Sequence, residues 1–363
     1  MKLGIVGLPN VGKSTIFNVM THNKAQTNNY MFSTLEPNIG IVDVPDERID
    51  FLSKLYDADK TTYATIEFVD IPGLVRGSNK GEGVGNKFLS SIQQVDALCH
   101  VVRCFDDDDL IHVDGSVNPV RDVETINLEL IFSDIDMIER RIERTSKAAK
   151  SGDKSYIPIL KFYNDLKEHL LEGKMAKSFK FENIEQETYM NELFLITVKP
   201  VLYVANVDEQ GMLEDNDYTK ALINLAESEE NEVIKVCAKF EEDLASLEKD
   251  EKDAFLADLG IKETGLERLI KKSYKLLDLM SFLTAGKKEV RAWTIKNNTT
   301  APKAAGKIHS DFERGFIRAE VFSYDDIKRL GSYNAVKEKG LVRSEGKTYI
   351  FKEGDIVLFR FNV

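Results

Sequence analysis

Residues 7–14 read Gly-Leu-Pro-Asn-Val-Gly-Lys-Ser, and this segment is the strongest indication of the fold class in the chain. Its spacing is that of a phosphate-binding loop, in which glycines let successive backbone N–H groups curl around a β-phosphate. An apolar run at 3–6 precedes the stretch, and a segment of helical character at 14–20 follows it. Because the motif requires this strand–loop–helix context, we expect the loop to bind the phosphates of a nucleotide.

The residues that close the loop have separate expected tasks. Lys13 reaches the β- and γ-phosphates and is the first candidate catalytic residue. The Ser14 hydroxyl is expected to ligate magnesium, and Thr15 to lie beside the α-phosphate. The N-terminus of the following helix adds positive potential. The nucleotide-binding residues predicted in this segment are Asn10, Val11, Gly12, Lys13, Ser14 and Thr15.

Two further segments complete the expected magnesium site. Asp70 directly follows the β-rich run 66–69, and the carboxyl ends of strands are where ligands bind in open α/β sheets. We expect Asp70 to hold magnesium through water and the Gly73 N–H to contact the γ-phosphate. Thr34, within the segment 32–38, is the candidate threonine that ligates magnesium only when the γ-phosphate is present.

Apolar β-rich runs alternate along the chain with stretches that can form helices. This alternation predicts an α/β fold with a mostly parallel sheet covered on both faces. The connection 103–200 is far longer than the roughly 10–12 residues that a crossover needs, so it contains an insertion. The predicted P-loop nucleotide-binding domain therefore comprises residues 1–127 and 200–280. Its later strands are expected at 65–69, 97–102, 201–205 and 233–236.

The insertion, residues 128–199, has the apolar spacing of a helical hairpin. Its first half repeats apolar residues at intervals of three and four, which is the seam of a coiled coil. The repeat ends at 151–153, and a second apolar stripe follows at 159–170. We expect an inserted coiled-coil hairpin that projects from the sheet; the alternative is two ordinary helices packed flat on the domain. The seam consists of Leu128, Ile131, Ile135, Ile138 and Ile142.

Composition changes after residue 280, where short alternating runs appear at 290–295, 316–321, 349–351 and 356–359. With a helical candidate at 324–330 they predict a small α+β domain over 281–363. This segment has a formal charge of +6, with 16 Lys+Arg and 10 Asp+Glu, whereas the whole chain has −12. Only this part is suited to RNA, although its lysines are equally compatible with a solvated face that matches the acidic remainder.

Other bulk properties concern location and redox state. No run of about 18 uncharged apolar residues exists, and residues 1–6 enter a strand rather than a signal peptide. We therefore expect a cytoplasmic protein with no membrane partner. Cys99, Cys104 and Cys237 lack the paired spacing of a zinc site, so we expect them to be reduced and structural.

The motif that reads the base departs from the guanine-binding pattern Asn-Lys-x-Asp. After the run 201–205 the chain reads Asn206-Val207-Asp208-Glu209, without the lysine and with a longer acid at the fourth position. Adenine offers an acceptor at N1 where guanine offers a donor, so a carboxylate aimed there would be repelled. Losing the guanine clamp leaves ATP at least as acceptable. The alternative is that Asp208 shifts register and still pairs with guanine.

Leu74 occupies the position after Asp70-x-x-Gly73 where signalling GTPases carry the glutamine that orients the attacking water. Leucine cannot do this, so a water-positioning group comes from elsewhere in the chain or from a partner. His112 follows the run 97–102 and the acidic residues 106–109, and it is the candidate. A lone histidine is more often a surface or packing residue.

Together these residues resemble the YchF family of Obg-related P-loop ATPases. The last third of the chain, with 300–305 and 315–321, is similar to that family's TGS domain, a β-grasp module. The resemblance runs along essentially the whole chain, through the segments 7–14, 32–38, 68–74, 80–88, 100–105, 206–209 and 288–294.

The resemblance implies magnesium-dependent ATP hydrolysis with a preference for ATP over GTP, and association with ribosomes. It also implies that the histidine at His112 acts in catalysis and that Val207 borders the adenine, beside Asn206 and Glu209. The family's base motif commonly has a non-acidic third residue, which is Asp208 here, so the base preference requires a test.

Three functions are open on the sequence. The first is an enzyme whose ATP hydrolysis times its attachment to the ribosome or other RNA, through residues 281–363 and the coiled coil. The second is a GTP-hydrolysing, ribosome-associated switch. The third is a nucleotide-gated adaptor in which turnover is incidental. In each case the expected ligands are Mg²⁺ and ATP or GTP, and the protein is expected to be a monomer.

Overall fold

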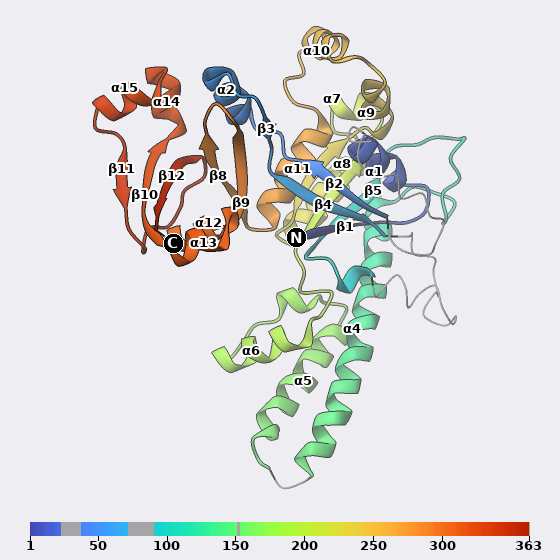
Figure 1. Ribbon diagram of the computed structural model, residues 1–363. Coiled ribbons are helices and arrows are strands. Elements are labelled where there is room, and N and C mark those ends of the chain that lie inside the picture. Colours follow the sequence, from blue (N-terminus) through green and yellow to red (C-terminus); the bar gives the residue numbers. More distant parts are fainter. Residues whose placement is uncertain (23–37, 72–90, 151–152, 363) are drawn as a thin grey trace. The chain divides into compact units, whose positions relative to one another are not determined.

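The computed structural model describes residues 1–22, 38–71, 91–150 and 153–362 (Figure 1). The chain divides into two compact units. The first consists of Met1–Gly40 and Glu67–Leu269, and the second of Ile41–Ile66 and Ile270–Val363. Each unit is therefore assembled from segments that are separated in the sequence.

The first unit is built on a six-stranded sheet in the order β2-β4-β1-β5-β6-β7. The pairs that join β4, β1, β5, β6 and β7 are all parallel, as the alternation of strands and helices predicts. Every residue of β5 and β6 is buried, because these central strands are covered on both faces. The strands are β1 (Lys2–Val6), β2 (Asn38–Asp43), β4 (Thr65–Asp70), β5 (Ala97–Arg103), β6 (Val201–Asn206) and β7 (Glu232–Val236).

Several helices accompany this sheet outside the insertion, in the part of the chain that the structure describes. The first begins directly after the predicted phosphate loop, and α9 follows β7 at the same edge of the sheet. Their bounds are α1 (Lys13–His22), α7 (Glu209–Leu213), α8 (Asp217–Ser228), α9 (Ala238–Ala245), α10 (Lys249–Asp258) and α11 (Gly265–Leu276). Among the residues described, no helix has the length and apolar character needed to cross a membrane.

The insertion between β5 and β6 is a helical hairpin with a core of its own, as predicted. Its long helix α4 (Pro119–Ala149) begins at the N-cap Asn118, whose side chain accepts the Arg121 N–H, and has Pro119 in its first turn. Helix α4 lies beside α5 (Tyr156–Leu171), and η2 (Ala176–Ser178) and α6 (Ile184–Leu193) complete the insertion (Figure 1). Apolar residues of these elements form one buried cluster.

One residue of the predicted seam lies outside that core. Ile131, Ile135 and Ile138 are buried in the cluster and Ile142 packs against it, whereas Leu128 is 45% exposed. The cluster with α5 begins only at Ile131, so Leu128 has no place in it.

Asp134 joins the hairpin to the nucleotide sheet. Its fully buried carboxylate accepts hydrogen bonds from the N–H groups of Ile196 and Thr197, at 2.9 and 2.8 Å, and from the Thr197 hydroxyl at 2.7 Å. These groups lie just before β6 in the sequence. A buried carboxylate is stable only with such partners, so Asp134 fixes α4 to the chain that leaves the insertion.

The second unit has a mixed sheet in the order β11-β10-β12-β8-β9-β3, with short helices around it. Its hydrophobic core includes Phe282, Val321 and Phe359, which form one buried cluster with residues of helix α12. The strands are β3 (Thr61–Thr62), β8 (Leu279–Ala285), β9 (Val290–Lys296), β10 (Phe316–Ser323), β11 (Arg343–Glu345) and β12 (Asp355–Phe361). The helices are α2 (Glu47–Tyr56), α12 (Ala301–Ile308), α13 (Ser310–Arg314), α14 (Tyr324–Leu330) and α15 (Tyr333–Glu338).

This unit is the predicted α+β domain, with two differences. The run 349–351 is not a strand: it forms an isolated bridge, Thr300 to Ile350. The unit also begins at residue 270 rather than 281 and takes in residues 41–66, which were expected in the nucleotide domain. The reason is that β3 pairs in parallel with β9, and Lys287 donates to the Asp57 carbonyl.

Candidate functional site

Residues 7–12 form the turn between β1 and α1, and its backbone requires glycine at two points. Gly7 and Gly12 have φ of 152° and 93°, where side chains are strongly disfavoured. A Cβ added to Gly7 would clash with the Val101 carbonyl oxygen, and one added to Gly12 with the Asn206 amide. The loop therefore packs directly against the ends of β5 and β6, which is how a phosphate-binding loop is held open at a sheet edge.

Lys13 and Asp70 place opposite charges at this edge. Lys13 is 7% exposed, and its Nζ donates to the Leu8 carbonyl at 3.4 Å. Burial lowers the pKa of Lys13, and the Asp70 charge opposes that shift. Burial likewise raises the pKa of Asp70, opposed by Lys13. Asp70 is the last residue of β4 and pairs in register with Ile5, so it ends beside the loop, as predicted.

This donor set fits a magnesium–nucleotide complex. Gly7 and Gly12 have no room for a side chain, a cationic Lys13 is available for phosphate oxygens, and Ser14 is exposed at the helix start. The Ser14 hydroxyl and the Asp70 carboxylate are oxygen ligands of the kind that magnesium prefers.

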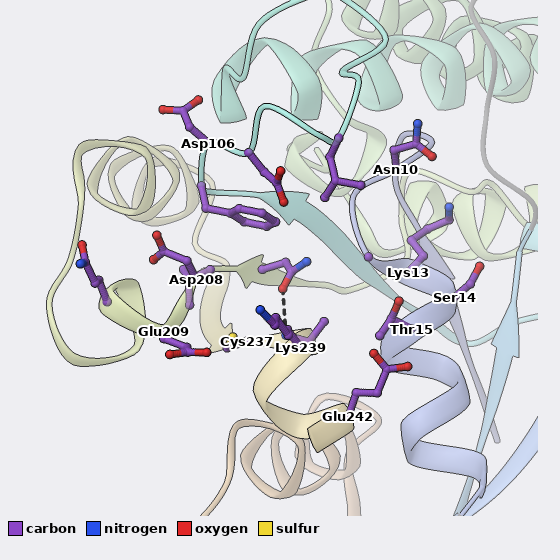
Figure 2. A pocket seen from close by; sticks show the side chains of 18 residues that line it. Asn10, Lys13, Ser14, Thr15, Asp106, Asp208, Glu209, Cys237, Lys239 and Glu242 are labelled. Atoms are coloured by element: carbon purple, nitrogen blue, oxygen red, sulfur yellow. Dashed lines mark hydrogen bonds between the residues drawn. The ribbon is translucent and has the colours of Figure 1, made fainter. Parts of the chain in front are cut away.

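A cavity of about 720 Å³ opens beside the loop (Figure 2). Lys13, Ser14 and Thr15 lie on one side of it, and Asp208 and Glu209 on the other. Its size suits a nucleotide, since ligand pockets typically have about 300–1,000 Å³. The lining residues are Asn10, Gly12, Lys13, Ser14, Thr15, Phe105, Asp106, Asp107, Leu110, Asn206, Val207, Asp208, Glu209, Gln210, Cys237, Ala238, Lys239 and Glu242.

The lining thus brings together most of the site residues predicted from the sequence. Of the predicted residues in the described part of the chain, Val11, Asp70 and His112 do not line the cavity. The backbone carbonyl of Val11 instead accepts a hydrogen bond from the Asn206 side chain. The predicted magnesium ligand Thr34 and the predicted phosphate contact Gly73 lie outside the described residues, as does Leu74.

Asn206 links three parts of the site. It ends β6 and is 4% exposed, its Nδ2 donates to the Val11 carbonyl at 2.9 Å, and its Oδ1 accepts the Ala238 N–H at 3.1 Å. The first bond reaches the phosphate loop and the second the start of α9. Asn206 therefore shapes the cavity by holding its walls together.

The next residues of the base motif also have local tasks. Val207 is 2% exposed and its N–H donates to the Val236 carbonyl at 3.0 Å. Asp208 is the N-cap of α7, because its Oδ1 accepts the Gly211 N–H at 2.8 Å. Glu209 is the first residue of that helix and faces the cavity (Figure 2). The Asp208 carboxylate is thus used for capping in this structure.

His112 is buried, and both of its ring nitrogens have partners. Nδ1 accepts the Asp114 N–H at 3.1 Å, and Nε2 lies 2.9 Å from Asp122 Oδ2. With Nδ1 acting as an acceptor, Nε2 is assigned the proton and donates it to the carboxylate. Arg121 holds the other Asp122 oxygen at 2.9 Å. In this arrangement His112 is held by the start of α4, and its role in catalysis stays a prediction.

The His112 loop nevertheless touches the phosphate loop. The Asn10 side chain donates to the Ile111 carbonyl at 3.2 Å, and Leu110 lines the cavity. The two loops are therefore joined by a hydrogen bond beside the cavity.

Arg103 is a residue of this site that sequence reasoning missed. It ends β5 and is 2% exposed, yet its guanidinium donates to three backbone carbonyls. These belong to Phe105 (3.0 Å), Asp107 (3.0 Å) and Leu110 (2.8 Å), all of which line the cavity. Arg103 thus fixes the shape of one cavity wall. The only signal in the sequence is a charged residue at the end of an apolar strand.

The sheet, the glycine-requiring loop before α1 and the Lys13–Asp70 pair define a P-loop nucleoside triphosphatase. Residues 2–138 match a family described as "50S ribosome-binding GTPase". Residues 279–362 match the C-terminal YchF-GTPase family, described as a protein of unknown function.

Full-length relatives and a solved structure agree with these matches. A Bacillus subtilis protein named "Ribosome-binding ATPase YchF" is 52% identical over 362 residues, 99% of each chain. The Escherichia coli O157:H7 protein of the same name is 47% identical over 100% of this chain and 99% of its own. The structure of the Schizosaccharomyces pombe YchF GTPase has a TM-score of 0.85 and 35% identity, covering 99% of this chain and 97% of its own. The chain belongs to the YchF family of P-loop nucleoside triphosphatases.

Proposed function

We propose that this protein is a magnesium-dependent ATPase that binds ribosomes and couples that binding to its nucleotide state. The bacterial relatives are named as ribosome-binding ATPases over the full length of this chain. The printed names differ on the nucleotide, because the S. pombe relative and the N-terminal family are described as GTPases. The choice of base therefore has to come from the site.

The observation that carries ATP over GTP is the use of Asp208. Guanine recognition needs a carboxylate that accepts from the N1–H and the exocyclic amine. Here the Asp208 carboxylate accepts the Gly211 N–H as the cap of α7, and the motif lacks its lysine. With Asp208 engaged in the cap, the acid of the motif that is left facing the cavity is Glu209, which is one methylene longer than the aspartate of the guanine motif. We infer that this longer acid does not form the guanine clamp, so guanine has no advantage over adenine in this pocket. Asn206, Val207 and Glu209 are left to border the adenine.

Magnesium would be held by Ser14 and Asp70, with Thr34 as a further ligand. When bound, it would neutralise charge on the β- and γ-phosphates. The chain's own contribution is positioning: the loop amides and Lys13 hold the phosphates, and Gly73 contacts the γ-phosphate. His112 would position the attacking water, and for this its ring would have to give up the hydrogen bond to Asp122.

Calorimetric titration with ATP and GTP, each with magnesium, tests the proposal. We expect ATP to bind at least tenfold more tightly, a difference of about 1.4 kcal/mol. Tighter binding of GTP would establish the alternative, a GTP-driven switch. An Asp208→Asn variant serves as the control, because it keeps an acceptor for the cap and removes the charge. If its preference for ATP equals that of the wild type, then Asp208 does not read the base.

We also propose that the protein is a monomer and acts in the cytoplasm with the ribosome as its partner. Light scattering at several protein concentrations tests the monomer. Co-sedimentation with 70S ribosomes, with and without ATP, tests the coupling. Equal ribosome binding with and without ATP would refute the coupling.

A further inference from the structure

Two arginines lie directly opposite each other on neighbouring strands of the second unit's sheet. In the antiparallel pair of β10 and β12, Arg318 is the register partner of Arg360. Their side chains are 53% and 50% exposed. Like charges at directly opposed positions of a sheet are destabilising, so this pair needs a compensating partner.

Glu320 supplies part of the compensation. Arg360 donates to it through Nε and Nη2, at 3.1 and 3.0 Å, and Arg318 donates through Nη2 at 3.1 Å. These bonds lower the pKa of Glu320, the Arg360 hydrogen bond contributing most. One carboxylate thus serves two guanidinium groups. The trio keeps a net charge of +1, and each half-exposed arginine has donors beyond those that Glu320 accepts.

Apolar side chains surround the arginines. Leu358 is the register partner of Glu320 and is 45% exposed. Ile317, at the irregularity of β10, is 55% exposed, and Phe361 is 39% exposed and stacks on Phe312. A shallow hollow is lined by Ile317, Arg318, Phe359, Arg360 and Phe361. Two planar cations beside an apolar and aromatic rim suit a ligand with both phosphates and flat bases.

We propose that this surface, made of Arg318, Arg360, Glu320, Ile317, Leu358 and Phe361, binds the phosphate backbone of RNA. The inference rests on the proposed ribosome binding and names the surface and the chemistry that serve it. Charge complementarity selects RNA: residues 281–363 carry +6 in a chain of −12. Arginine is suited to phosphate because its fork of donors matches two oxygens at once.

Substitutions of the two arginines and of Glu320 should change RNA affinity in opposite directions. In Arg318→Gln/Arg360→Gln, both phosphate donors lose their charge, and RNA affinity falls roughly tenfold. The slope of log affinity against log salt falls by about 1.5, since two phosphate contacts are lost. In Glu320→Gln, the competing carboxylate is neutral, and affinity rises. Impaired folding would lower affinity in both variants.

The measurements use the full-length protein, deproteinised ribosomal RNA in filter binding, and 70S ribosomes in co-sedimentation. Lys328→Gln/Arg329→Gln is the matched control, because it removes two charges from α14 of the same unit. ATP turnover without ribosomes should be unchanged in all variants.

Three outcomes decide the inference. Wild-type RNA affinity in Arg318→Gln/Arg360→Gln overturns it, as does equal loss in the control. Loss of ribosome binding with unchanged RNA binding overturns it too, because the surface then docks on an acidic protein. If the wild type itself fails to sediment with ribosomes, the proposed function fails instead.

Discussion

Replacing Asn206 by alanine should weaken nucleotide binding by more than its effect on folding explains. The side chain makes two buried hydrogen bonds, to the Val11 carbonyl and from the Ala238 N–H. Each buried group left without a partner costs about 1–3 kcal/mol, so we expect the free energy of unfolding to fall by roughly 2–6 kcal/mol. The freed Val11 carbonyl belongs to the phosphate loop, so the loop also loses its fixed shape.

We expect ATP affinity to fall about 10- to 100-fold, which corresponds to about 1.4–2.7 kcal/mol. The measurements are urea denaturation without nucleotide and calorimetric titration with magnesium and ATP. Asn216→Ala is the matched control. Asn216 also makes two hydrogen bonds, from the Thr219 N–H and to the Cys104 carbonyl, but it does not touch the phosphate loop. Equal ATP affinities of the two variants would refute the reasoning.

Three further predictions follow from described contacts. His112→Ala should bind ATP with near wild-type affinity but turn it over at least tenfold more slowly; unchanged turnover would make His112 a packing residue. Asp134→Ala should lower the free energy of unfolding by about 3–5 kcal/mol, because three buried donors lose their acceptor; a loss under 1 kcal/mol in urea denaturation would contradict this. Burial lowers the pKa of His100 to about 3, so the folded state binds fewer protons than the unfolded state. Stability is therefore full above the unfolded pKa near 6.5 and falls with acidification, by about 2 kcal/mol from pH 6.5 to 5, and His100→Gln should flatten this slope.

The sequence predicts the nucleotide-binding half of this protein well because its signals are local. The loop 7–14 fixes its own strand and helix, and the buried strands β5 and β6 read as continuous apolar runs. The hairpin follows from the spacing of Ile131, Ile135 and Ile138.

What the sequence does not predict depends on contacts between distant segments. The two-residue strand β3 has no recognisable pattern and exists through its pairing with β9, over 200 residues away. The strand β8 (Leu279–Ala285) lies outside the short alternating runs from which the sequence predicts this domain. The partners of His112 and the three carbonyls of Arg103 are likewise set by loop conformation, which spacing alone does not encode.

The discontinuity of the second unit has a consequence for its synthesis. Helix α2 and strand β3 leave the ribosome early, but the sheet that receives them is encoded after residue 270. At about 5–20 residues per second, the roughly 200 intervening residues take on the order of 10–40 s to make. During that time α2 and β3 have been synthesised but the strands that receive them have not. A chain shortened to residues 279–362, the range of the C-terminal family, would lack the same segment and expose the edge of β9.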